Sequence, residues 1–262
     1  MSTLEFIAQV HPSLFGKLRN LLWELGVGGT LCYVVYRLCA RTGGLAALHR
    51  YLFVAQPVPM AALLPPRRGG SILVRQVDAG DPLLLSLPLQ DHVLRYRAGQ
   101  GAICFGAFKS GEIVGCLWLC LTPYEEDEVR CRYHPEPSGR ASWDFDVYLK
   151  PDHRSGLGFA RLWDTANGFL RDRDAVVSWS RISAFNPASI ASHARLGARV
   201  VGKATFFRIG PCQVMVASVA PYVHVSFRRS DMPDLRLSVP HTAPAHMVGI
   251  DGSQPSSSNS SS

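Results

Sequence analysis

The segment Trp143 to Gly158, WDFDVYLKPDHRSGLG, constrains the fold more than any other part of the chain. An alternating strand runs into a Pro-Asp turn, then into a basic Gly-x-Gly loop, and then into an apolar helix that starts at Gly158. A junction of this kind directs several backbone N–H groups toward one point beside a helix N-terminus, and such a point suits a phosphate group. The segment therefore predicts a phosphate-binding loop between a strand and a helix.

A second unit of strand and helix follows about thirty residues later. The strand predicted over Val176–Ser183 leads to Asn186-Pro187, and a short helix over Pro187–Leu196 ends at Leu196-Gly197. Together the two units indicate an enzyme that holds a pyrophosphate cofactor between two splayed strands.

The pattern around these units predicts the rest of the fold. The expected elements are strands over Ser71–Val77, Ala102–Phe108, Glu112–Leu121, Ser142–Lys150, Arg199–Arg208 and Gln213–Val219, and helices over Pro82–Arg97, broken at Pro88, and over Gly158–Arg171. Lys109-Ser110-Gly111 predicts a hairpin turn between two of these strands. This order predicts an α/β fold of the α+β type, with a mixed, mostly antiparallel central sheet flanked by helices.

The segment order and two motifs resemble the GNAT superfamily of acyl-coenzyme A-dependent N-acyltransferases, over about residues 71–219. In that family a basic loop ending in Gly-x-Gly leads into a helix that holds the coenzyme A pyrophosphate, and the similar loop here is His153-Arg154-Ser155-Gly156-Leu157-Gly158. The second motif, NPASIASHARLGARVVG over residues 186–202, is similar to the family's Asn-x-x-Ala-x-x-x-Tyr-x-x-x-Gly-Phe segment. The resemblance implies a GNAT-like fold with acetyl-CoA, or another acyl-CoA, as co-substrate.

The resemblance also implies residues of the cofactor site. The loop from His153 to Gly158 would hold the pyrophosphate, with Arg154 adding positive charge. The pantetheine and the thioester would lie against the backbone of β-strand residues Val147, Tyr148 and Leu149 and against Asn186 and Ser189.

His193 stands where the family has a tyrosine that protonates the departing thiolate. A histidine with an ordinary pKa of about 6.5 exchanges protons around neutral pH and would serve the same purpose. The alternative is that His193 is a surface residue of its helix without a chemical role.

Asp144 and Asp146 are the carboxylates that we expect to take the proton from an attacking amine. Side chains two positions apart on a strand point to the same face, and aromatic neighbours raise a carboxyl pKa toward the range of a general base. Asp144 is the first choice for the base. The alternative is that both aspartates face solvent or pair with an arginine such as Arg181.

Four consecutive acidic residues, Glu125–Glu128, lie in the hairpin region that borders the acceptor site in the resembled fold. A cluster of carboxylates there would attract a cationic amine. The alternative is an ordinary solvated loop.

Residues 1–66 are expected to form a helical extension before an acyltransferase domain over 67–229. Helical spacing covers Phe15–Leu25, Thr30–Cys39 and Leu45–Val54. The uncharged run Leu25–Tyr36 is shorter than the roughly 20 residues that cross a bilayer. Peripheral membrane contact through residues 15–54 and simple packing on the core are the two alternatives.

The remaining composition limits the partners and the location. The Pro/Ser-rich segment 230–262 is expected to be a disordered tail. A net charge of +7 without DNA-binding motifs favours a phosphate cofactor or a membrane surface over nucleic acid. Seven cysteines without a Cys-x-x-Cys indicate a reducing cytoplasm, and the histidines offer no recognisable metal site. The glycine loop does not follow a first strand, as a dinucleotide-binding Rossmann domain requires, and no Gly-x-Ser-x-Gly elbow occurs.

The sequence therefore predicts a cytoplasmic acyl-CoA-dependent N-acyltransferase, at the inner face of the membrane if its N-terminal helices bind lipid. The acceptor would be a small-molecule or peptide amine. The alternative is a non-catalytic acyl-CoA-binding or membrane-associated interaction protein with the same fold.

Overall fold

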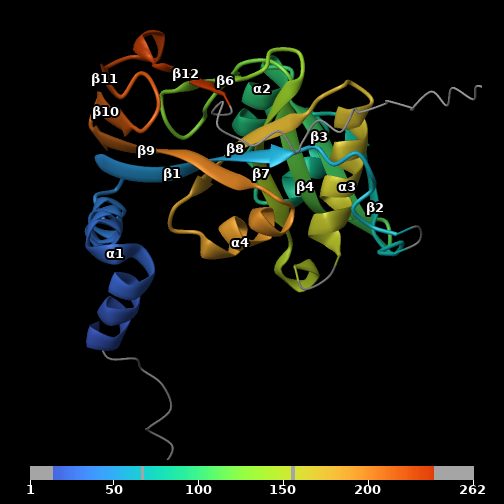
Figure 1. Cartoon of the computed structure of the whole chain (residues 1–262), viewed down its shortest axis with the longest axis horizontal. Coiled ribbons are helices and arrows are strands. Elements are labelled where there is room, and N and C mark those ends of the chain that lie inside the picture. The colour runs from blue at the N-terminus through green and yellow to red at the C-terminus, as the bar shows by residue number, and fades with distance from the viewer. Residues whose placement is uncertain (1–13, 66–67, 155–156, 239–262) are drawn as a thin grey trace, which may run out of the picture.

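The computed structural model describes residues 14–65, 68–154 and 157–238 (Figure 1). Its helices are α1 (Leu14–Cys39), α2 (Asp91–Gly99), α3 (Gly158–Arg171) and α4 (Pro187–Arg195), with short 3₁₀ helices η1 (Pro82–Ser86), η2 (Pro151–His153) and η3 (Arg229–Asp231). Its strands are β1 (Ala46–Pro57), β2 (Leu73–Val77), β3 (Ile103–Lys109), β4 (Glu112–Cys120), β5 (Tyr124–Glu125), β6 (Arg132–Pro135), β7 (Ala141–Leu149), β8 (Val177–Ser183), β9 (Arg199–Ile209), β10 (Cys212–Ala217), β11 (Val223–Ser226) and β12 (Asp234–Leu237).

Nine of these strands form one sheet in the order β11-β10-β9-β1-β8-β7-β4-β3-β2. Within the described residues, β7 and β8 are its single parallel pair, and α3 is the crossover helix that a parallel pair requires. A second, small sheet has the order β12-β6-β5. The predicted fold class, a mixed and mostly antiparallel sheet flanked by helices, is confirmed.

The large sheet buries side chains on both of its faces. In β4, Leu117 and Leu119 belong to the core under α3, while Trp118 and Cys120 belong to the core on the opposite face. The opposite face is closed by α2 and by the small sheet, which contributes the fully buried Tyr133. Figure 1 shows α3 beside the β2–β4 end of the sheet and α1 at the other end, below β1 and β9.

The segment Leu45–Val54, predicted as a helix, is instead the main part of strand β1. β1 lies inside the large sheet and pairs antiparallel with β8 on one side and with β9 on the other. A short apolar run fits a buried strand as well as a helix, so periodicity alone does not decide between them. Residues 46–57 therefore belong to the same sheet as the later strands, not to a separate helical extension.

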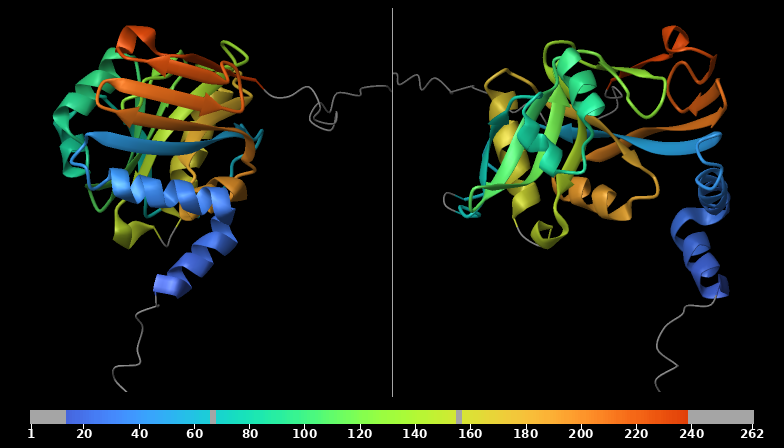
Figure 2. Two further views of the ribbon diagram at one scale, coloured as in Figure 1. Left: turned by 90° about the vertical axis from the view of Figure 1, so that its left-hand side faces the viewer. Right: turned by 180° about the vertical axis from the view of Figure 1, so that it is seen from behind.

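Helix α1 packs against β1 and bends at Gly26, whose φ of 67° and ψ of 175° are not helical. The bend lies between the predicted helical ranges Phe15–Leu25 and Thr30–Cys39, and Figure 2 shows the two helical segments that it joins. None of the helices in the described part of the chain has both the length and the hydropathy of a membrane span.

The C-terminal region is ordered further than the sequence predicted. β12 pairs in parallel with β6, and its Leu235 and Leu237 are buried in the core. The prediction of a disordered tail over 230–262 is therefore wrong for these residues, and residues 239–262 lie outside the described part. Overall composition indicates a tail here but does not take account of the spacing of Leu235 and Leu237, which are two residues apart and therefore lie on one face of a strand.

The acidic segment is also part of the folded core. Tyr124, Glu126 and Cys131 are buried, and β5 pairs with β6. The alternative of a solvated loop is wrong, because the aromatic and apolar residues around the carboxylates anchor the segment against the sheet.

Candidate active site

The site begins where the parallel strands β7 and β8 part. They pair over four residues, of which the last are Asp144 and Ser180, although β7 continues to Leu149 and β8 to Ser183. Beyond this point the facing edges of β7 and β8 no longer pair with each other through backbone hydrogen bonds. The sheet therefore has an opening between the ends of two neighbouring strands.

Asp146 forms a bulge in β7 immediately after the strands part. It has a φ of 52°, and Asp146 and Val147 together lie opposite the single residue Leu117 of β4. The bulge places the Asp146 carboxylate with Arg97 on the Phe145 face. Asp144, paired with Leu119, lies on the α3 face. The prediction that the two aspartates share a face is wrong, because a bulge breaks the two-residue period.

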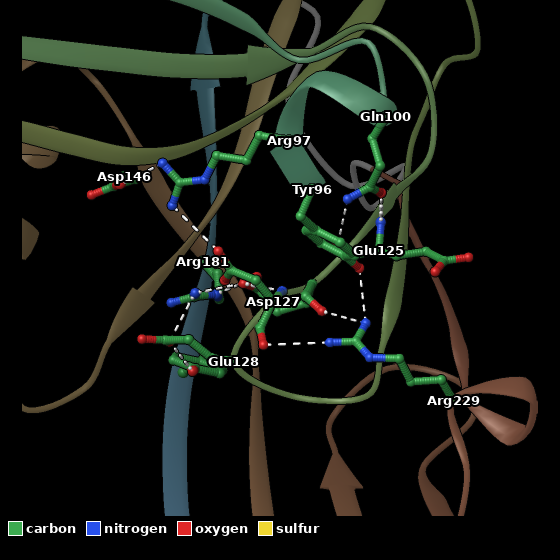
Figure 3. Close-up of polar contacts among 11 residues, drawn as sticks. Tyr96, Arg97, Gln100, Glu125, Asp127, Glu128, Asp146, Arg181 and Arg229 are labelled. Carbon is green, nitrogen blue, oxygen red and sulfur yellow. Dashed lines mark hydrogen bonds and ion pairs between the residues drawn. The ribbon is translucent and has the colours of Figure 1, made fainter. Parts of the chain in front are cut away.

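A cavity of about 720 Å³ lies on the Phe145 side of this opening. Its charged and hydroxyl-bearing walls come from α2, the acidic segment, β7, β8 and η3, and consist of Tyr96, Arg97, Glu126, Asp127, Glu128, Asp146, Arg181 and Arg229 (Figure 3). The volume is in the range of small-molecule sites. Of the three predicted catalytic residues, only Asp146 lines this cavity.

Glu126 and Arg181 form a buried ion pair in the cavity wall. Arg181 Nε and Nη2 donate to the two carboxylate oxygens of Glu126 at 2.6 and 2.8 Å, and Arg181 Nη2 lies 2.9 Å from Glu128. Burial acts to raise the pKa of Glu126, but the charge and hydrogen bonds of Arg181 outweigh it and lower the pKa to about 2. Glu126 is therefore ionised at neutral pH and fixes the acidic segment rather than exchanging protons.

Asp127 has the opposite character. Burial and the neighbouring Glu126 raise the pKa of Asp127 to about 7, against the opposing charge of Arg97. Arg97 Nη2 lies 3.3 Å from Asp127, and Arg97 Nη1 donates to Asp146 at 2.6 Å (Figure 3). A carboxylate with a pKa near neutral, held in place by an arginine in a cavity, has the properties of a general base.

A smaller cavity of about 300 Å³ adjoins the first one and shares Asp127, Glu128 and Arg229 with it. Four arginines line it, namely Arg130, Arg208, Arg228 and Arg229, and none of them forms an ion pair with another described residue. Burial and the charges of Arg208 and Arg229 lower the pKa of Arg130. Such a concentration of like charge suits a negatively charged group of a ligand.

The predicted strand contacts of the coenzyme lie beyond the opening. Val147 and Leu149 pack on the α3 face, and Tyr148 packs on the opposite one. Arg154 Nε donates to the carbonyl oxygen of Leu149 at 2.8 Å, and the guanidinium carbon lies 5.6 Å from the centroid of the Tyr148 ring. His153 ends the 3₁₀ turn that follows β7. These five residues connect the opening to the start of α3.

Helix α3 begins close against β7. Gly158 is buried, and a Cβ atom added to it would lie 3.2 Å from the methyl groups of Leu149. Leu157 is the N-cap residue, and no side chain of the described residues caps the helix, so none of them occupies the first N–H groups, which could bind an anion. Ser155 and Gly156, the other predicted loop residues, lie outside the described part of the chain.

Asn186 caps helix α4. Its Oδ1 accepts a hydrogen bond from the Ser189 N–H at 3.1 Å. The adjacent Phe185 packs against Tyr33 and Tyr36 of α1, with ring centroids 5.4 and 5.2 Å apart. The cap is a sufficient reason for asparagine at this position. The role of Asn186 and Ser189 in binding a coenzyme stays a prediction.

His193 and Asp144 are buried away from both cavities. His193 Nδ1 lies 3.3 Å from Gln56 Oε1, its ring meets Trp163 edge to face, and burial lowers its pKa to about 4. Asp144 accepts a hydrogen bond from Ser178 Oγ at 2.8 Å, and burial raises its pKa to about 7 against that bond. The alternatives that His193 lies on the surface and that Asp144 faces solvent are therefore wrong. The chemical roles predicted for the two residues stay predictions.

Sequence reasoning missed Arg97, Tyr96 and Arg229. They come from α2 and η3, far from the motifs in the sequence, and meet the acidic segment only in the folded chain. The signal for Arg97 was its place three residues after the buried Leu94, which puts an arginine on the inner face of an amphipathic helix.

No family model matches the sequence, and no curated protein matches it. Among solved structures, a protein assigned to the GNAT family of acetyltransferases from Novosphingobium aromaticivorans has 16% identity and a TM-score of 0.44, over 60% of this chain and 62% of its own. A conserved protein of unknown function from Staphylococcus epidermidis has 10% identity and a TM-score of 0.47, over 77% of this chain and 82% of its own. An aminoglycoside acetyltransferase from an uncultured soil metagenomic sample has 13% identity and a TM-score of 0.35, over 48% of this chain and 88% of its own.

The chain thus spans less than two thirds of the length of the first of these proteins. The resemblance to GNAT proteins that the motifs predicted is found in three dimensions, as a general likeness of fold.

Proposed function

We propose that this protein is an N-acyltransferase that moves an acyl group, by default acetyl, from coenzyme A to a primary amine. One observation carries the proposal: β7 and β8 part directly beside a cavity in which Asp127 has a pKa of about 7. The opening offers an extended thioester a route between two strands, and Asp127 offers the amine a base.

The residues beyond the opening fit coenzyme A. The free edge of β7 from Phe145 to Leu149 would hold the amide groups of pantetheine by backbone hydrogen bonds. The start of α3, which no described side chain caps, and the nearby Arg154 would hold the pyrophosphate charge. When bound, the thioester supplies an activated acyl carbon.

Residues of the large cavity would carry out the proton transfer. The carboxylates of Asp127 and Glu128 attract an ammonium group, and ionised Asp127 takes one of its protons. The neutral nitrogen then attacks the acyl carbon, a carbon–nitrogen bond forms and the carbon–sulfur bond breaks. The second proton that the nitrogen loses passes to the departing thiolate, which leaves as a thiol. Arg97, which contacts both Asp127 and Asp146, holds the base in position.

The arginine-lined cavity favours an acceptor that carries an acidic group close to its amine. An ammonium at Asp127 and an anion near Arg208 and Arg228 would occupy the two adjoining cavities at once. A small amino acid or an amino compound bearing a carboxylate or phosphate has this distribution of charge.

The test measures thiol release from acetyl-CoA with a panel of amines, together with the thermal shift that coenzyme A produces. A ligand at 100 times its dissociation constant adds about 2.7 kcal/mol to stability, which raises the melting temperature by several degrees. Amine-dependent thiol release supports the proposal. A thermal shift without turnover would instead favour a non-catalytic acyl-CoA-binding protein, and the absence of both would contradict the coenzyme site.

A further inference from the structure

The charges of this chain are divided between two parts of the fold. Residues 25–77 contain six arginines, residues 175–230 contain six arginines and a lysine, and neither stretch contains an aspartate or a glutamate. These stretches supply β1, β8, β9, β10 and β11, which are the five adjacent strands at one end of the large sheet, and they also supply β2 at its other edge. They also supply α4 and the part of α1 that follows Glu24. The five strands at this end therefore carry no acidic residue of their own. Glu126 and Glu128 of the acidic segment contact Arg181 and Tyr51 of these strands on the face that holds the buried core.

Helix α1, at this end, exposes an apolar stripe. Val27, Leu31, Val34 and Leu38 follow the spacing of one helix face, and their exposed fractions are 78%, 64%, 41% and 55%. The opposite face attaches the helix to the molecule, since Thr30 and Cys39 are buried and Tyr33 and Tyr36 pack on Phe185. A helix on a water-exposed surface normally shows its polar face to solvent, and α1 does the reverse.

The sheet face next to α1 is apolar and uncovered as well. Val216 lies opposite Val223, and Val214 lies opposite Val225. Val216, Val223 and Val225 are 54%, 62% and 49% exposed. The left view of Figure 2 shows α1 and strands β9–β11 on the side toward the viewer, with no other described element in front of them. Scattered surface valines need no explanation, but cross-strand neighbours beside an apolar helix form a patch.

We propose that this face, made of the α1 stripe and the outer face of β10 and β11, binds the surface of an anionic lipid bilayer. An apolar helical stripe beside arginines is the pattern of a helix that lies in the membrane interface, and Arg37 and Arg41 are exposed next to the stripe. The apolar side chains enter the boundary between headgroups and acyl chains, while the arginines meet the lipid phosphates.

The charge distribution separates this partner from a second copy of the chain. Two copies facing each other through the α1 stripe, β10 and β11 would bring together elements that carry arginines and, after Glu24, no acidic residue, so their positive charges would repel. An anionic bilayer supplies the missing negative charge and an apolar layer together.

The test is co-sedimentation of the full-length protein with vesicles of phosphatidylcholine alone and of phosphatidylcholine containing phosphatidylglycerol. We expect binding to the anionic vesicles, weakening as salt is raised, and little binding to the neutral ones. The measurement needs no acyl transfer, so its outcome is independent of the proposed enzymatic activity.

Two double variants identify the face. Val27→Ser with Leu31→Ser removes the most exposed part of the stripe, and Arg37→Gln with Arg41→Gln removes two charges. Each should lower the partition coefficient by roughly tenfold or more, because each basic residue at an anionic surface contributes about fivefold.

Matched controls lie in other parts of the fold. Met60→Ser replaces a side chain that is 91% exposed beyond the far end of β1, and Arg95→Gln with Lys109→Gln removes two exposed charges from α2 and the β3–β4 turn. We expect wild-type binding from both. Equal binding to neutral vesicles, equal losses in the controls, or no vesicle binding by the folded protein would overturn the proposal. The proposal would also be overturned if the wild-type protein did not bind vesicles but formed a dimer that the α1 variants dissociate.

Discussion

Asp127 is the residue on which the proposed chemistry depends most. A base must be ionised to accept a proton, so kcat/KM should be low at pH 5.5 and should rise through an apparent pKa of about 7. Asp127→Asn should lower kcat/KM by at least about 100-fold and abolish this rise, while leaving the thermal shift by coenzyme A in place.

The matched control is Asp91→Asn, which changes an exposed carboxylate on α2 outside the cavity. Initial rates of thiol release between pH 5.5 and 9 make the comparison. A variant at position 127 that kept the wild-type pH profile would remove Asp127 from the proton transfer.

Asp144 gives a prediction about stability rather than turnover. Its pKa is raised from 3.8 to about 7 by burial, so the native state holds a proton that the unfolded chain releases above pH 4. The stabilising effect is complete below pH 4 and is lost as the pH rises through 7, by a total on the order of 4 kcal/mol.

Asp144→Asn removes this titration, because asparagine is neutral at every pH and can still accept the hydrogen bond of Ser178. The free energy of unfolding in urea should therefore fall less between pH 5 and 8 in the variant than in the wild type. The exposed Asp152→Asn serves as control. Identical pH dependence in wild type and Asp144→Asn would show that Asp144 does not titrate in this range.

At the scale of elements, the contact of α3 with β7 sets the geometry of the predicted phosphate loop. Gly158→Val would bring methyl groups into Leu149, which already lies 3.2 Å from the position of an added Cβ atom. The start of the helix should move away from the strand, and the dissociation constant for coenzyme A should rise by about tenfold or more. Calorimetric titration measures it, and Gly168→Val, later in the same helix where the space is less tight, separates this effect from helix propensity.

The arginine-lined cavity makes a prediction about selectivity among acceptors. Arg208→Gln should raise KM for amines that carry a carboxylate or phosphate by about tenfold and leave KM for neutral amines within twofold. Kinetics with a pair of amines that differ only in an acid and its amide would measure this. An equal change for both members of the pair would contradict an anion-binding role for Arg208.

Elements with strong local signals could be predicted from the sequence, and those decided by distant partners could not. The amphipathic helix α3 and the Ser110-Gly111 turn, where both residues have positive φ, are specified by their local sequence alone. β1 does not, because its apolar run becomes a strand only through its pairing with β8 and β9.

The candidate site divides along the same line. The glycine loop and Asn186 are visible as motifs, and the run Glu125–Glu128 is visible as a group. Which of its members stays ionised and which takes up a proton depends on Arg181 and Arg97, which reach the segment from other elements. The bulge at Asp146 cannot be recognised from the alternating sequence of β7. The prediction that Asp144 and Asp146 lie on one face was therefore wrong.

At the scale of the whole molecule, β1 connects the N-terminal region to the remaining fold. Its Tyr51 and Phe53 are buried in the core, and it fills the sheet between β8 and β9. A chain shortened to begin at Leu45 keeps this strand and should remain soluble, with a cooperative thermal transition. A chain shortened to begin at Gly69 leaves the edges of β8 and β9 bare and should aggregate.

Soluble yield, circular dichroism and melting curves of the two shortened chains test this expectation. Wild-type melting behaviour in the chain that begins at Gly69 would mean that β1 contributes little to the fold.

The position of β1 also has a consequence for how the chain folds while it is being synthesised. Both of its neighbours are encoded more than a hundred residues downstream, at 177–183 and 199–209. At a synthesis rate of about 5–20 residues per second, β1 is complete roughly 6–25 s before β8, the first of its two partners, has been synthesised. During that interval the apolar side chains of β1, among them Tyr51 and Phe53, have no sheet to enter and are available to chaperones or to neighbouring nascent chains. The first strand of this sheet along the sequence is thus among the last to be paired, and the two halves of the sheet can join only after β8 and β9 have been synthesised.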